Sequence, residues 1–132
     1  MYADIVVDVG ISNFDVEPGC IGYLIHPFIF VMMKVVVTGS EGFIGKALCR
    51  ELAKRDVEVI GLDRKSGIEA TKVCELLKNG GIDCVFHLAA QTSVFNGNLE
   101  QIRRDNIDTF MRVADACNQN HVKLIYASSS TA

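Results

Sequence analysis

The stretch from residue 35 to residue 45, VVVTGSEGFIG, constrains this chain more than any other part of it. A β-branched run leads directly into glycines at positions 39, 42 and 45, which is typical of a buried strand that turns into a helix around a phosphate. Gly39 would permit a tight turn, Gly42 the approach of a pyrophosphate, and Gly45 close packing of the helix. The anion would lie on free N–H groups at the positive end of that helix.

The residues that follow fit a βαβ unit. Apolar side chains recur at helical spacing from Phe43 to Leu52, and a second strand is expected over residues 57–62. It ends at Asp63, 18 residues after Gly45 and near the offset of a carboxylate that binds an adenosine ribose. Such a carboxylate accepts from both ribose hydroxyls and repels a 2′-phosphate, so NAD is favoured over NADP. Arg64 weakens this preference, because a neighbouring cation could receive a phosphate. An ordinary βαβ unit whose strand ends in Asp is the alternative.

Composition excludes several classes of function. The chain has 132 residues, 49% hydrophobic and 22% charged, which suits one compact soluble core. Its formal net charge is −3 without a basic block, so no nucleic-acid partner is expected. The five cysteines form no C-x-x-C pair and are interpreted as reduced core thiols of a cytoplasmic protein. The three histidines lack ligand-like spacing, so no metal site is expected.

Residues 1–32 differ from the remainder and are treated as an N-terminal extension, while residues 33–132 form the second unit. The apolar run over residues 21–33 is interrupted by His26-Pro27 and is shorter than the roughly 20 residues that a spanning helix needs, so no membrane partner is expected. No Lys or Arg precedes this run, which argues against a signal peptide. We expect Met33 to be the natural start. A mis-assigned start and a membrane-touching leader remain two explanations for the extension.

Three later segments carry further candidates. Residues 82–88 form a nearly continuous apolar run, as in a buried parallel strand, and end in the small residues Ala89 and Ala90. A long helix over residues 99–118 has Asn106 on its apolar stripe, where the amide must bond neighbouring backbone or serve a site. A strand over residues 122–127 precedes three serines, of which Ser130 is the last. His87 is expected to be a packed strand residue.

The ordered set T-G-x-x-G-x-x-G, Asp63, His87-Leu88-Ala89-Ala90, Asn106 and Ser128-Ser129-Ser130 resembles the extended short-chain dehydrogenase/reductase family, of the NAD-dependent epimerase/dehydratase type. The resemblance covers about residues 33 to 132 and implies a nucleotide-sugar enzyme. In such enzymes a sugar carbon passes a hydride transiently to tightly held NAD.

The resemblance also implies roles for single residues. It implies a catalytic hydroxyl at Ser130 that bonds the substrate oxygen. It further implies cofactor contacts, which lie at Gly39, Gly42, Phe43, Ile44, Gly45, Asp63, Arg64, Leu88, Ala89, Ala90 and Asn106. Relatives often dimerise through two long helices, and the resemblance therefore implies a homodimer as a further partner. Only one of these helices, over residues 99–118, lies within residues 1–132.

Two departures from the family pattern qualify this interpretation. The strand and acidic turn that normally follow the Asp63 strand are deleted or reduced to a few residues near Ile68. The Tyr-x-x-x-Lys pair is also absent from residues 1–132. Tyr is the proton acceptor, and without it the hydride step lacks its acid/base partner. A truncated product or designed fragment is therefore expected rather than a complete enzyme.

We therefore predict an α/β fold, a Rossmann-like doubly wound parallel sheet cut short. Strands are expected near 34–38, 57–62, 84–88 and 123–127, with right-handed crossovers and an additional helix over residues 68–77. The resemblance implies the strand order 2-1-4-5. The predicted function is the NAD-binding part of a nucleotide-sugar epimerase or dehydratase. The alternatives are a non-catalytic dinucleotide-binding module and an inactive fragment.

Overall fold

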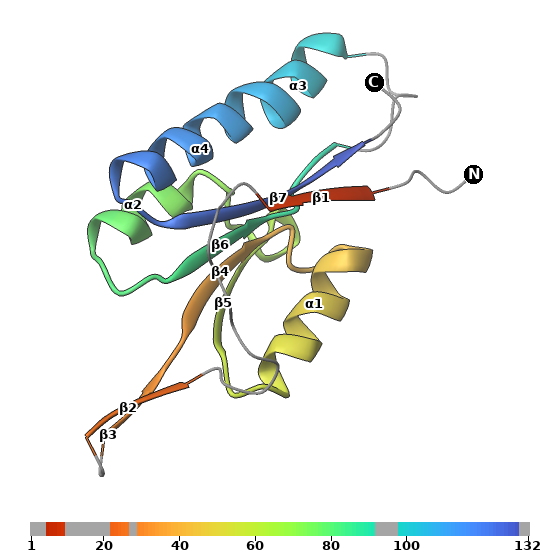
Figure 1. The fold of residues 1–132 in the computed structure, drawn as a ribbon. Helices are drawn as coiled ribbons and strands as arrows, with labels where there is room; N and C mark the ends of the chain where they lie inside the picture. Colours follow the sequence, from red (N-terminus) through yellow and green to blue (C-terminus); the bar gives the residue numbers. More distant parts are fainter. Residues whose placement is uncertain (1–4, 10–21, 27–28, 92–97, 130–132) are drawn as a thin grey trace.

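The computed structural model describes the backbone of residues 5–9, 22–26, 29–91 and 98–129 (Figure 1). Side chains are described for residues 32–91 and 98–128. No helix in this part of the chain is long and apolar enough to cross a membrane.

A five-stranded sheet in the order β1-β7-β6-β4-β5 forms the centre of the molecule. Four strands are parallel: β4 (Lys34–Thr38), β5 (Glu58–Leu62), β6 (Cys84–His87) and β7 (Lys123–Ser129). Their order, β5-β4-β6-β7, is the predicted order 2-1-4-5, and the α/β fold class is confirmed. The chain leaves β4 towards β5 on one side and returns to β6 on the other. A topological switch point therefore lies between β4 and β6.

Helices cover both faces of the sheet (Figure 1). Helix α1 (Phe43–Ala53) packs on one face against Val35 and Val37, and α2 (Lys72–Lys78) and α4 (Thr109–Gln119) pack on the other against Val36. These valines alternate because successive side chains of a strand point to opposite faces. All three are at most 1% exposed, so the strand that leads into the glycine turn is fixed by core packing on both sides.

The third strand of the family pattern is absent between β5 and α2, in agreement with the predicted deletion. The chain instead forms η1, a 3₁₀ turn over Arg64–Ser66, in which the Asp63 carboxylate caps the Lys65 N–H at 2.9 Å. Gly67 then adopts φ +77°. Helix α2 starts at Lys72, four residues later than the predicted start at residue 68. Residues 63–67 thus form a hydrogen-bonded turn in the segment where the family pattern has its third strand. Strand β5 is left at the edge of the sheet.

The long helix predicted over residues 99–118 has three parts. Helix α3 (Leu99–Arg103) and α4 are joined by η2, a π-helical turn over Arg104–Asp108. Such turns insert one extra residue into a helix and are frequent at functional sites. Side chains from this turn contact the segments that follow β5 and β6, as described below.

The N-terminal segment adds strands that the sequence analysis did not predict. Strand β1 (Ile5–Val9) pairs antiparallel with β7 and extends the sheet beyond the four predicted strands. The apolar run before Met33 contains a hairpin of β2 (Gly22–His26) and β3 (Ile29–Met32). Figure 1 shows this hairpin projecting from the end of the sheet at which β4 begins.

Candidate functional site

The glycine turn after β4 is built by close backbone contacts. Gly39 has φ +70°, and a Cβ there would lie 2.8 Å from the Ala89 nitrogen. A Cβ at Gly45 would lie 2.0 Å from the Gly39 oxygen, so α1 packs against the turn itself and not only against the strands as expected. At Gly42 the nearest atom is the Gly39 oxygen at 3.2 Å. Gly39 and Gly45 are therefore required by the backbone, whereas Gly42 has more room.

The N-terminus of α1 opens beside this turn. Its N-cap is Gly42, no side chain bonds the first N–H groups, and no acidic residue lies in the first turn. The opening N–H groups of a helix have no intrahelical acceptor and carry the positive end of the helix dipole. Phe43 is 95% exposed and Ile44 is 38% exposed, so two apolar side chains flank the same opening. This arrangement suits an anion attached to an apolar or aromatic group.

Asp63 lies next to the turn, as the ribose interpretation requires. Its Oδ2 accepts a hydrogen bond from the Glu41 N–H at 2.9 Å, while Oδ1 accepts from the Lys65 N–H. Glu41 in turn accepts from the Ser66 hydroxyl at 2.6 Å. A carboxylate has about four acceptor positions, so two remain for ligand hydroxyls. The predicted anion cradle and the predicted ribose acid thus lie side by side.

The loop after β6 is fixed to β4 by one buried hydroxyl. Thr38 Oγ1 accepts from the Leu88 and Ala89 N–H groups, both at 3.2 Å, and donates to His87 Nδ1 at 2.8 Å. Burial lowers the pKa of His87 to about 4, so its ring is neutral near pH 7. His87 is therefore a packed strand residue, in keeping with the prediction.

A pocket of about 270 Å³ lies where β6, β7 and α4 meet. It contains four of the predicted site residues, Leu88, Ala89, Ala90 and Asn106, and is completed by His87, Phe110, Tyr126, Ala127 and Ser128. The Phe110 ring lies 4.9 Å from the Tyr126 ring and 5.9 Å from the His87 ring. The sequence analysis missed this aromatic lining. Phe110 belongs to the helix predicted over residues 99–118, and nothing in a linear pattern shows that the apolar stripe of this helix faces a pocket.

Asn106 both bonds backbone and lines this pocket. Its Oδ1 accepts from the Gln91 N–H at 2.6 Å, and its Nδ2 donates to the Gln91 oxygen at 3.0 Å. The amide on the apolar stripe is thus satisfied by neighbouring backbone, one of the two outcomes expected. A contact with a cofactor stays a prediction.

The guanidinium of Arg64 is bound to two carboxylates of this chain. It bonds the Asp105 carboxylate through Nη1 at 2.9 Å and Nη2 at 2.5 Å, and Nε bonds Glu69 at 3.1 Å. Asp105 is 9% exposed, and Arg64 lowers the pKa of its carboxyl. The predicted Arg64 contact with the cofactor is not visible in these bonds and stays a prediction.

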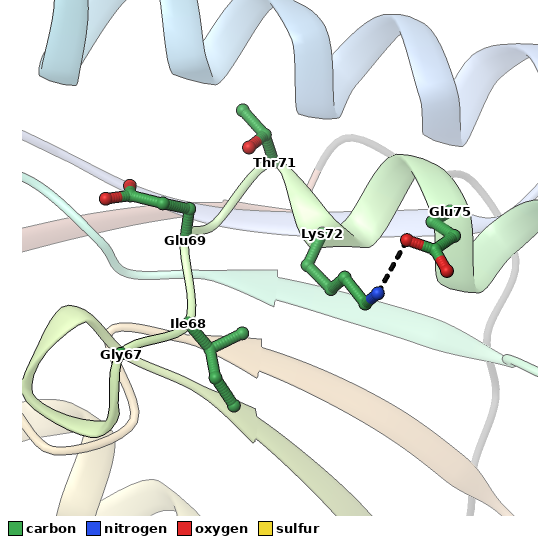
Figure 2. A pocket seen from close by; sticks show the side chains of 6 residues that line it. All are labelled: Gly67, Ile68, Glu69, Thr71, Lys72 and Glu75. Carbon is green, nitrogen blue, oxygen red and sulfur yellow. Dashed lines mark hydrogen bonds and ion pairs between the residues drawn. The ribbon is translucent and has the colours of Figure 1, made fainter.

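A second pocket, of about 450 Å³, lies between η1 and α2 (Figure 2). Its charged lining side chains are engaged, because Lys72 pairs with Glu75 at 2.6 Å and Glu69 with Arg64. Among the residues that the structure describes, no group of three His, Cys, Asp or Glu side chains could hold a metal ion. Ser130, the predicted catalytic residue, lies outside the described residues.

Comparison with known proteins identifies the group to which this chain belongs. The model of the NAD dependent epimerase/dehydratase family matches residues 35–132. A 2-alkyl-3-oxoalkanoate reductase of Stenotrophomonas maltophilia is 30% identical over 111 residues, which cover 74% of this chain and 33% of that protein. The uncharacterized UDP-glucose epimerase YtcB of Bacillus subtilis is 28% identical over 130 residues, which cover 75% of this chain and 40% of that protein.

A solved structure shows the same fold with ligands. It is the UDP-glucose 4-epimerase of Stenotrophomonas maltophila with bound NAD and formylated UDP-arabinopyranose. This structure matches with a TM-score of 0.63 at 25% identity, over 75% of this chain and 38% of that one. The chain thus spans well under half the length of the relatives that it matches. With the motif order, the sheet order and the family model in agreement, this chain belongs to the NAD-dependent epimerase/dehydratase family.

Proposed function

We propose that this chain binds NAD at the turn after β4 and is the NAD-binding part of a nucleotide-sugar epimerase or dehydratase. The observation that carries the proposal is the 2.9 Å hydrogen bond from the Glu41 N–H to the Asp63 carboxylate. It joins the glycine turn to the acid that would hold the adenosine ribose. A diphosphate on the turn and a ribose on Asp63 are adjacent parts of one dinucleotide.

The roles of the residues follow from this placement. The N–H groups that open α1 hold the diphosphate, and Phe43 and Ile44 flank it. The two remaining acceptor positions of Asp63 take the ribose hydroxyls. Ala89 and Ala90, at the carboxyl end of β6, leave space for the cofactor to extend towards the pocket beside Asn106.

When bound, NAD supplies an acceptor for the hydride that leaves a sugar carbon. By the family pattern, the hydroxyl of Ser130, which follows β7 in the sequence, would hold the substrate oxygen through a hydrogen bond. The proton acceptor of the family, a Tyr in Tyr-x-x-x-Lys, is not within residues 1–132. The nucleotide-sugar substrate is supported by the UDP-glucose epimerases among the relatives, whereas another relative is named a 2-alkyl-3-oxoalkanoate reductase. We place the reaction in the cytoplasm.

Calorimetric titration of NAD into the chain tests the proposal. We expect weak binding at best, because the second half of the family's crevice is not within residues 1–132. Asp63→Ala and Gly42→Val should abolish it, by removing the ribose acceptor and by placing a branched side chain over the diphosphate.

The matched control is Asp83→Ala. It removes a carboxylate that also accepts from a backbone N–H, that of Lys34 at 2.8 Å, but at the opposite end of the sheet. This variant should bind NAD like the parent chain. Unchanged affinity in Asp63→Ala, with the fold intact by circular dichroism, would remove Asp63 from the site. Submicromolar affinity of the parent would contradict the expectation of weak binding.

A further inference from the structure

The guanidinium beside the proposed ribose acid is fully engaged away from it. All three nitrogens of Arg64 donate to carboxylates, two to Asp105 and one to Glu69. Two parallel bonds between a guanidinium and a carboxylate form the geometry that is both strong and directional. Arg64 follows Asp63 directly in sequence, so its orientation decides which charge the ribose meets.

Asp105 is held rigidly in the position that this pairing needs. It lies in the π-helical turn η2, its neighbour Asn106 is fixed to the Gln91 backbone, and its Oδ2 also accepts from Gln101 Nε2 at 3.3 Å. Asp105 is 9% exposed, whereas the side chain of Arg64 is 49% exposed. The buried carboxylate of Asp105 therefore has a fixed position, and the more exposed guanidinium of Arg64 is oriented by its bonds to that carboxylate. Without Asp105, the arginine would be free to adopt other rotamers.

We propose that Asp105 determines the choice between NAD and NADP by holding the Arg64 guanidinium away from the ribose at Asp63. The inference rests on the proposed function, because it assumes that a dinucleotide binds there. A free guanidinium next to the ribose would pair with a 2′-phosphate, for which its planar donors are well suited. Asp105 removes this cation from the site, and the carboxylate of Asp63 alone then faces the 2′ position.

Two ligands isolate this choice, ADP-ribose and its 2′-phosphate, since both need only the half of the crevice formed by β4, β5 and α1. Calorimetry measures each with the parent chain, Asp105→Asn, Arg64→Met and the double variant. We expect Asp105→Asn to raise the affinity for the 2′-phosphate about tenfold, one charge-assisted bond pair, and to leave ADP-ribose within about twofold. The double variant should lose this gain, because the guanidinium is gone.

The matched control is Glu69→Gln, which removes the negative charge that pairs with Arg64 Nε but keeps both bonds to Asp105. It should leave both affinities within about twofold of the parent. Arg64→Met alone should also leave both unchanged, because an arginine bound to Asp105 contributes nothing to the ligand. If Asp105→Asn does not fold, this variant still tests the inference, because a loss of 2′-phosphate affinity would contradict it.

The outcomes distinguish a failure of the inference about Asp105 from a failure of the proposed function. An unchanged affinity ratio in a folded Asp105→Asn variant overturns the inference and leaves the proposed function standing. A loss of 2′-phosphate affinity in Arg64→Met also overturns it, because Arg64 would then already contact the phosphate. No binding of ADP-ribose to the parent chain overturns the proposed function, and the inference with it.

Discussion

At the scale of single residues, packing restricts position 45 of the turn to glycine more strictly than position 42. A Cβ at position 45 would overlap the Gly39 oxygen at 2.0 Å, whereas one at position 42 would lie 3.2 Å from it. The first overlap can be relieved only by moving backbone. Position 45 is therefore restricted by packing in the unliganded chain, and position 42 mainly by the proposed ligand.

This contrast predicts the stability of two matched variants. Gly45→Ala should lower the free energy of unfolding by about 3 kcal/mol or more, the upper end of overpacking costs, because the overlap is with backbone atoms. Gly42→Ala has an ordinary φ of −72° and should cost less than about 1 kcal/mol. Urea unfolding measures both. Equal costs for the two variants would contradict the packing role of Gly45.

The lowered pKa of the buried His87 ring predicts that the stability of the fold depends on pH. Its folded pKa, about 4, lies below the ordinary value of 6.5 because burial disfavours the charged ring. The unfolded chain therefore binds more protons between these values, and stability is lost as the pH falls from 6.5 to 4. The loss attributable to His87 is on the order of 3 kcal/mol. His87→Asn, which keeps an acceptor for Thr38 but does not titrate, should show a flatter profile by urea unfolding across this range; an equally steep profile would assign the loss to other groups.

At the scale of elements, one hydroxyl connects β4 to the loop after β6. Thr38 is 0% exposed, and the Ala89 N–H donates to its Oγ1. The glycine turn and this loop form the two walls of the proposed crevice, and they meet where Gly39 approaches Ala89. The spacing between the walls is thus set by Thr38 and not by the glycines alone.

Thr38→Val keeps the shape of the side chain but removes these hydrogen bonds. It should cost about 1–3 kcal/mol, the range for leaving a buried donor unsatisfied. Amide exchange at Ala89 should accelerate, as followed by NMR or mass spectrometry. Thr38→Ser retains the hydroxyl and should protect Ala89 nearly as well as the parent residue; if both variants exchange alike, the hydroxyl does not fix this loop.

A second element-scale contact joins η2 to the same loop. Asn106→Asp keeps an acceptor for the Gln91 N–H but replaces a donor with an oxygen that faces the Gln91 carbonyl. We expect a loss of about 1–3 kcal/mol near pH 7. This loss should shrink as the pH falls below 4, where the new carboxyl is protonated and can donate. A loss independent of pH in urea unfolding would argue against the paired geometry.

At the scale of the whole molecule, the two core clusters consist of residues from Met33 onward, one on each face of the sheet. Every helix of the described chain starts at Phe43 or later. We therefore expect a chain of residues 33–132 to keep its helical circular dichroism and to unfold cooperatively. It would lose the pairing of β1 with β7. An exposed strand edge promotes association, so sedimentation should show more self-association than for the full chain. Loss of cooperative unfolding would show that the extension belongs to the fold.

The family resemblance supplied the strand order, while the sequence alone determined the buried parallel strands and the place of the glycine turn. These features depend on local patterns: apolar runs that must be buried on both faces, and glycines at a spacing that only a tight strand-to-helix turn explains. It also indicated that the third strand was missing, because only a few residues separate Asp63 from the next helix.

Only the tertiary structure decided which side chains meet. Arg64 and Asp105 are 41 residues apart, and Asn106 and Gln91 are 15 apart, so no local period connects them. The π-helical turn that presents both Asp105 and Asn106 also leaves no signal in an apolar stripe. The aromatic pocket and the pairing of β1 with β7 depend likewise on chain segments brought together by packing. Local pattern fixed the backbone path because its interactions are local, whereas the charge facing the proposed ribose depends on a partner that folding alone supplies.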